Sequence, residues 1–187
     1  MLLGAHFPDR VSTLTLMITT SDMRSNIDAF QGKPSKSRLS PPNPAVLAWV
    51  KNYITDPPKT LEEKVTKFLE GGRIQNGSKV PFDEELNHQL ALQAFLRTRD
   101  PISMFNHLKA AEVSYDLYKQ ATSQIKAPTL IIHGDQDPNF ALDHGEALKQ
   151  AIPHAQLNII AGMGHGLNTH FYDVLIDKIQ GIAKDKI

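Results

Sequence analysis

The last third of the chain alternates two kinds of apolar pattern, and this alternation limits the possible folds more than any other feature. Short runs of apolar and β-branched residues at 128–133 and 156–160 predict buried strands. Helical patterns at 143–152 and 168–184 follow them. Two strands joined by a helix form a right-handed βαβ unit, which requires a parallel sheet. We therefore predict an α/β fold.

The beginning of the chain contributes to the same sheet. Residues 1–6 are typical of the end of a helix, and Pro8 and Asp9 make a turn. The stretch VSTLTLMITT at 11–20 predicts another buried strand. We therefore expect the core of the fold to be assembled from both ends of the chain.

Between these ends lies a helical block. It starts with a polar, proline-rich connector at 21–44, and four helical patterns follow it, at 44–54, 60–70, 83–98 and 100–113. The sequence thus predicts three parts. Residues 1–21 hold the end of a helix and the first strand of the core, residues 22–115 form a helical cap, and residues 116–187 complete the core.

Capping residues mark the ends of these helices. Thr60 and Glu63 have the spacing of a capping box, and Asp83 and Asp100 are candidate N-caps. The glycine pair at 71–72 is expected to end the helix that Thr60 begins.

Composition excludes several classes of function. The chain has no cysteine, so it has no disulfide scaffold, thiolate metal site or cysteine nucleophile. Its 20 basic and 20 acidic residues balance, which argues against a nucleic-acid partner or an anionic membrane surface. No apolar run approaches the roughly 20 residues that span a bilayer, and the first residues lack a signal-peptide pattern. We expect a cytoplasmic protein without metal or cofactor.

Two short motifs follow the two predicted strands of the last third. HGDQDP occupies 133–138, and GMGHG occupies 162–166. Functional groups of parallel sheets gather beyond the carboxyl ends of the strands, so an aspartate and a histidine from these loops can meet. A carboxylate beside an imidazole fixes its tautomer and stabilises its protonated form. Asp135 and Asp137 are the candidate acids, and His165 is the candidate base.

These motifs resemble those of the α/β-hydrolase superfamily. The pattern of strand, HGxxDP, helix and IPxAxLxxIxGxGH matches 128–165, and HFPDRV at 6–11 resembles the end of the helix after the nucleophile. PFDEE at 81–85 is similar to a segment of aclacinomycin methylesterase-like and proline iminopeptidase-like hydrolases. The resemblance implies the C-terminal part of an α/β-hydrolase fold, a parallel sheet with an inserted helical cap. It also implies Asp137 as triad acid and His165 as base.

The same resemblance implies serine-type hydrolysis of a small-molecule carboxylic ester. The family nucleophile lies in a G-x-S-x-G elbow, which does not occur in these 187 residues. Ser78 lies in a turn of the cap region with no strand before it, and Ser12 and Ser21 flank the first predicted strand, downstream of the place that the elbow takes in the family. We expect the nucleophile and the oxyanion hole to lie on a missing N-terminal segment or chain, and the isolated chain to be inactive. The alternatives are a non-catalytic binding or regulatory module, and an aminopeptidase or lactonase completed by an upstream segment.

Some apolar residues are candidates for the substrate pocket. Trp49 and Phe105 could line an acyl pocket under the cap, and Met163, near His165, could touch the substrate. Aromatic residues at helical spacing are more often plain core. The remaining histidines of the helical and loop segments lack metal-ligand spacing, and we expect them to be solvated or to cap helices: His88, His107, His144, His154 and His170.

Overall fold

A computed structural model describes residues 1–98, 103 and 105–184. Within them, three parallel strands form one sheet in the order β1 (Leu14–Met17), β2 (Thr129–Gly134) and β3 (Gln156–Ile160). Leu16 pairs with Ile131, and Ile132 pairs with Asn158. The predicted parallel sheet is therefore confirmed, and the middle strand β2 is buried along its whole length.

The first strand is shorter than the predicted stretch at 11–20. Ile18 has a φ of 42°, which lies outside the extended region and turns the chain directly after Met17. A β-branched residue rarely adopts this conformation. Residues 18–21 therefore leave the sheet and run along its carboxyl edge, where they line the cavity described below.

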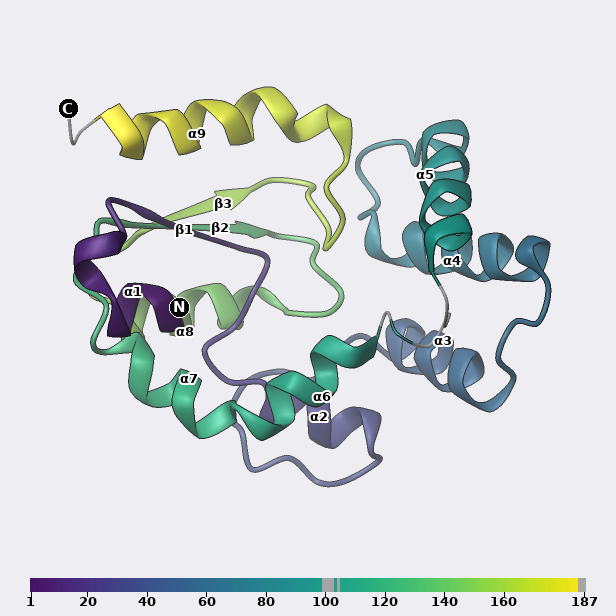
Figure 1. Cartoon of the computed structure of the whole chain (residues 1–187), viewed down its shortest axis with the longest axis horizontal. Helices are drawn as coiled ribbons and strands as arrows, with labels where there is room; N and C mark the ends of the chain where they lie inside the picture. Colours follow the sequence, from purple (N-terminus) through teal and green to yellow (C-terminus); the bar gives the residue numbers. More distant parts are fainter. Residues whose placement is uncertain (99–102, 104, 185–187) are drawn as a thin grey trace.

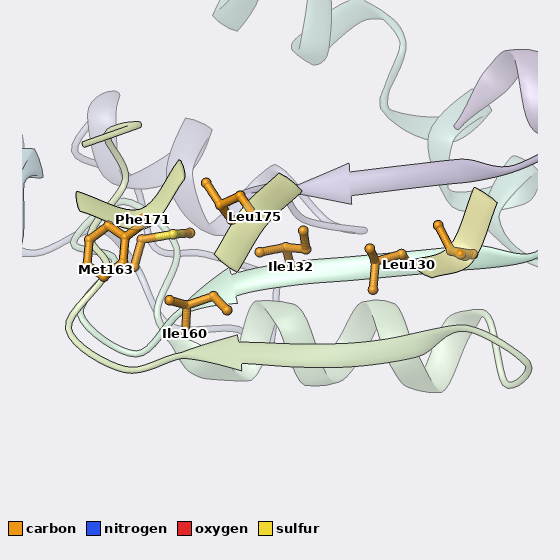
Figure 2. Packing of buried hydrophobic residues seen from close by; sticks show 7 residues of the cluster. Leu130, Ile132, Ile160, Met163, Phe171 and Leu175 are labelled. Carbon is orange, nitrogen blue, oxygen red and sulfur yellow. The ribbon is translucent and has the colours of Figure 1, made fainter. Parts of the chain in front are cut away.

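Helices cover both faces of the sheet (Figure 1). On one face lies α9 (Tyr172–Lys184), preceded by a short 3-10 turn at Thr169–Phe171, and on the other lie α1 (Leu2–His6) and α8 (Leu142–Ala151). Side chains of β2 alternate between the two faces, as the period of a strand dictates. Leu130 and Ile132 pack in the cluster that contains Leu175 of α9 (Figure 2). Ile131 packs with Leu148 of α8 instead.

The sequence did not predict α7 (Tyr115–Thr122), which follows α6 (Asn106–Val113) after a break at Ser114. It packs against α1. Another helix, α2 (Arg24–Phe30), lies within the predicted connector. There Asp22 Oδ1 accepts a hydrogen bond from the backbone N–H of Arg24, which satisfies a free donor of the first turn.

The remaining helices, α3 (Pro44–Thr55), α4 (Leu61–Gln75) and α5 (Glu84–Arg97), lie beyond the carboxyl ends of the strands (Figure 1). The capping box of Thr60 and Glu63 and the Asp83 cap are confirmed. The expected cap at Asp100 lies outside the described residues. In the described part of the chain, no helix combines the length and the apolar character needed to cross a membrane.

The prediction that the glycine pair ends α4 is wrong, since the helix continues through Gly71 and Gly72 to Gln75. A Cβ on Gly71 would collide with the indole of Trp49, and one on Gly72 would lie 2.8 Å from Cζ of Phe82. Trp49 also donates its indole N–H to the carbonyl of Lys67, at 2.9 Å. The two glycines therefore allow aromatic rings to lie close to the helix rather than ending it.

Candidate active site

Asp137 lies in the loop that follows β2. Its side chain is fully buried. Its Oδ1 accepts hydrogen bonds from the backbone N–H groups of Asn139 and Phe140, both at 2.8 Å. These bonds hold the carboxylate in one orientation, with Oδ2 directed at the loop after β3.

His165 lies in that second loop, and the structure brings it to Asp137. Its Nδ1 is 2.9 Å from Oδ2 and 3.1 Å from Oδ1 of the carboxylate. The imidazole is 22% exposed and packs against the ring of Phe140, with centroids 5.4 Å apart. An ionised carboxylate can only accept, so Nδ1 carries the proton and Nε2 of the neutral ring is an acceptor. Within the described residues, no hydrogen bond occupies Nε2.

Asp135, the other candidate acid, has a different role. Its Oδ1 accepts the backbone N–H of Gly162 at 2.6 Å, and its Oδ2 lies 3.7 Å from Nζ of Lys79. Asp135 thus ties the loop after β2 to the start of the loop after β3. The pairing with His165 belongs to Asp137.

A cavity of about 480 Å³ opens beside His165. Trp49 and Phe105 both line it, with ring centroids 6.1 Å apart. Met163 does not line it, because this side chain is fully buried in the cluster under α9. Apart from the polar groups near His165, the walls are chiefly apolar and aromatic, and they include Phe30, Val46, Val50, Leu108, Tyr115 and Phe140.

Several polar residues of the cavity were missed from the sequence. Asn26, on α2, is buried and donates its Nδ2–H to the carbonyl of Asn139 at 2.8 Å. Gln75 lines the cavity from the end of α4, and Ser21 from the turn after β1. These residues come from distant segments and share no pattern, so no signal in the sequence could have grouped them.

The serines do not complete a triad here. Ser78 donates its hydroxyl to Oε1 of Gln136, at 2.8 Å. Ser12 is exposed, and Ser21 lines the cavity. Among the described residues, no serine forms a hydrogen bond with His165.

The described residues also contain no group of three or more histidine or carboxylate side chains placed to hold a metal ion.

One histidine contradicts the expectation of solvent exposure. His144, on α8, is fully buried, with Nδ1 2.8 Å from the Thr20 hydroxyl and Nε2 2.9 Å from the Ser40 carbonyl. Burial lowers the pKa of this imidazole below its ordinary value. His144 therefore joins the turn after β1 to the segment before α3 as a neutral group. The other four predicted histidines are exposed: His88, His107, His154 and His170.

Comparison with known proteins agrees with this architecture. The family model described as alpha/beta hydrolase fold matches residues 1–168. Rhodomycin D methylesterase DnrP of Streptomyces peucetius is 30% identical over 172 residues, covering 89% of this chain and 56% of that protein. The chain thus spans little more than half the length of this curated relative.

Two esterases are among the solved structures of similar fold. Esterase RhEst1 from Rhodococcus sp. ECU1013 superposes with a TM-score of 0.64 at 16% identity, over 97% of this chain and 59% of that one. Esterase EaEST from Exiguobacterium antarcticum gives a TM-score of 0.62 at 17% identity, over 97% and 60%. At such identities the likeness concerns the fold alone.

Proposed function

The chain belongs to the α/β-hydrolase family, and from this premise we propose that it carries the acid and the base of a serine-type carboxylic ester hydrolase. The observation that carries the proposal is the contact between Asp137 and His165, 2.9 Å long, at the wall of an apolar cavity. In this proposal Asp137 orients the imidazole, and Nε2 of His165 faces the reacting groups.

The chemistry is acyl transfer to water. As a serine hydroxyl attacks the ester carbonyl carbon, His165 Nε2 takes the hydroxyl proton, and it then gives this proton to the departing alcohol. A water molecule next attacks the acyl-serine, again losing a proton to His165. His165 returns this proton to the serine oxygen as the carboxylic acid departs, which restores the serine hydroxyl and the neutral imidazole. Asp137 stays ionised throughout and stabilises the imidazolium.

We place the nucleophile outside these 187 residues. The sequence contains no G-x-S-x-G elbow, and the chain covers 56% of a methylesterase relative. Because a missing serine nucleophile lowers turnover about 10⁶-fold, these residues alone are expected to be inactive. Two of the three proposed triad groups are present, and they cannot replace the third.

For the substrate, we propose an ester of a small alcohol with a bulky, aromatic acid. Trp49, Phe105 and Tyr115 give the cavity wide aromatic walls, which suit a large planar or apolar acyl group. The 30% identical relative is a methylesterase, which favours a methyl ester.

Hydrolysis of p-nitrophenyl acetate tests the proposal. We would assay the 187-residue chain, and the chain extended by any coding sequence that precedes residue 1 in its gene, each with a His165→Ala variant. The expected result is activity only in an extended chain that contains G-x-S-x-G, and its loss in the variant. If the 187-residue chain itself hydrolysed the ester in a His165-dependent way, the placement of the nucleophile would be wrong.

The second candidate is a binding module without catalysis. It is favoured by the fact that the described residues themselves wall a cavity of about 480 Å³. Titration with methyl 2-naphthoate, followed by the indole N–H resonance of Trp49, distinguishes the two functions. Binding by an extended chain that hydrolyses no ester would favour the module.

The division of the chain into parts also remains a proposal. We keep a core piece at 1–21, the cap at 22–115 and a second core piece at 116–187. The packing of α7 against α1 supports ending the cap near residue 115. The cytoplasmic location stays a prediction from the sequence.

A further inference from the structure

We propose that the segment 75–81, which ends α4 and leads toward α5, is a positioning element that holds the His165 loop in register with the acid loop. The inference rests on the proposed function, because it concerns how the base of that reaction is placed. It assigns to the cap a role in building the catalytic pair, in addition to covering the cavity.

The backbone of Gln75 supplies the first contact. Gln75 is the last residue of α4, so its carbonyl has no partner within the helix. Its oxygen accepts hydrogen bonds from the backbone N–H of His165 at 2.8 Å and of Gly166 at 3.3 Å. The C-terminal end of α4 is thus tied directly to the backbone of the loop that carries the base.

Glycines make this approach possible. Gly77 has a φ of 84°, and a Cβ there would lie 2.7 Å from the carbonyl oxygen of Gly162 and 3.1 Å from the nitrogen of Gly164. A Cβ on Gly164 would in turn collide with the carbonyl oxygen of Gln75. The backbone of the 75–81 segment and that of the His165 loop therefore lie so close together that neither Gly77 nor Gly164 has room for a side chain.

Side chains connect the same segment to both functional loops. Oε1 of Gln136, next to Asp137, accepts from the backbone N–H of Ser78 at 2.7 Å and from its hydroxyl at 2.8 Å. On the other loop, Nδ2 of Asn168 donates to Oδ1 of Asn76 and to the carbonyl of Pro81, both at 2.9 Å. The segment thus bridges the acid loop and the base loop.

Gln75 also reaches the cavity. It lines the same cavity as His165, while its carbonyl accepts hydrogen bonds from the His165 loop. A displacement of the end of α4 must therefore shift the imidazole relative to Asp137. In this way the cap and the placement of the base are mechanically coupled.

The test compares Gly77→Ala with Gly32→Ala. Both glycines have a positive φ, 84° and 65°, but a Cβ on Gly32 has nothing within 4 Å. Both variants carry the same kind of backbone strain, and only Gly77→Ala separates the loops. Two NMR readouts report on His165: exchange of its backbone amide with D₂O, and the Nδ1–H resonance, assigned by its loss in His165→Gln.

In Gly77→Ala we expect the His165 amide to exchange at least about tenfold faster, because one hydrogen bond is lost, and the Nδ1–H resonance to move. Gly32→Ala should leave both unchanged. Unchanged His165 signals in Gly77→Ala would overturn the inference. If Gly77→Ala does not fold, Ser78→Ala removes only a hydroxyl contact with Gln136. It should accelerate exchange to a smaller degree, whereas Ser123→Ala, whose hydroxyl bonds locally to Gln120, should not.

The same spectra separate this inference from the proposed function. A wild-type Nδ1–H resonance that is insensitive to Asp137→Asn would refute the catalytic pair itself. A resonance that responds to Asp137→Asn but not to Gly77→Ala or Ser78→Ala would refute only the positioning role.

Discussion

The imidazole Nδ1 of His165 lies 2.9 Å from Oδ2 of Asp137, and this contact joins the loops that follow two neighbouring parallel strands. The exposure of the two side chains differs: the carboxylate is fully buried, while the imidazole is 22% exposed at the cavity. One partner is therefore fixed by the protein, and the other is accessible to a ligand.

Removal of the Asp137 carboxylate should destabilise the fold. Asp137→Ala leaves the backbone N–H groups of Asn139 and Phe140 without an acceptor, and Phe140 is buried. We expect the free energy of unfolding to fall by about 2 to 4 kcal/mol, as urea denaturation would measure. Asp177→Ala, at an exposed position on α9, should change it by less than about 0.5 kcal/mol. Equal effects of the two variants would contradict this account.

His144 should make stability depend on pH. Burial lowers its pKa in the folded state, so at acidic pH the unfolded chain binds a proton that the folded chain resists. The contribution of neutral His144 to the free energy of unfolding is complete above about pH 6.5, the ordinary pKa of histidine, and is lost as the pH falls below that value. Urea unfolding between about pH 7.5 and 5 should show a smaller decline in His144→Gln than in the wild type. His170→Gln, at an exposed site, should keep the wild-type slope.

Gly71 and Gly181 should respond to alanine in opposite directions. Both lie in helices, α4 and α9, but a Cβ on Gly71 collides with Trp49, while one on Gly181 meets nothing within 4 Å. Gly71→Ala should lower stability by about 1 to 3 kcal/mol through overpacking, and shift the Trp49 fluorescence. Gly181→Ala should raise stability by about 0.5 to 1 kcal/mol through helix propensity. Thermal unfolding followed by circular dichroism measures both changes in stability. If Gly71→Ala stabilised the protein, α4 and Trp49 would have moved apart to accommodate the added Cβ, contrary to this prediction.

Met163 and Phe105 should separate core packing from ligand binding. Met163 is fully buried under α9, and Phe105 lines the cavity. Met163→Ala should cost about 2 to 5 kcal/mol of stability and leave the affinity for methyl 2-naphthoate unchanged. Phe105→Ala should weaken that binding several-fold, with a smaller loss of stability. If Met163→Ala weakened binding in a chain that stayed folded, the side chain would have a role at the cavity.

Much of the fold was readable from local patterns. The run PTLIIH predicted β2 because a strand buried on both faces is continuously apolar, and Thr60 with Glu63 predicted the start of α4 because both capping bonds lie within one turn. The weaker signals failed: α2 lies in a polar connector, and α7 follows α6 without a marked boundary. The end of β1 at Ile18 also escaped prediction, since nothing in a β-branched run indicates a positive φ.

The candidate site divides in the same way. The sequence by itself determined that an aspartate and a histidine follow adjacent parallel strands, because strand periodicity and loop residues are set by neighbours in the chain. Only the tertiary structure decided that Asp137 faces His165 while Asp135 holds Gly162, that Gly71 serves the Trp49 ring, and that Gln75 supports the base loop. These relationships depend on how helices and loops pack across the sheet edge. The contacts join residues that lie far apart in the chain, and a local sequence pattern does not specify which distant residues meet.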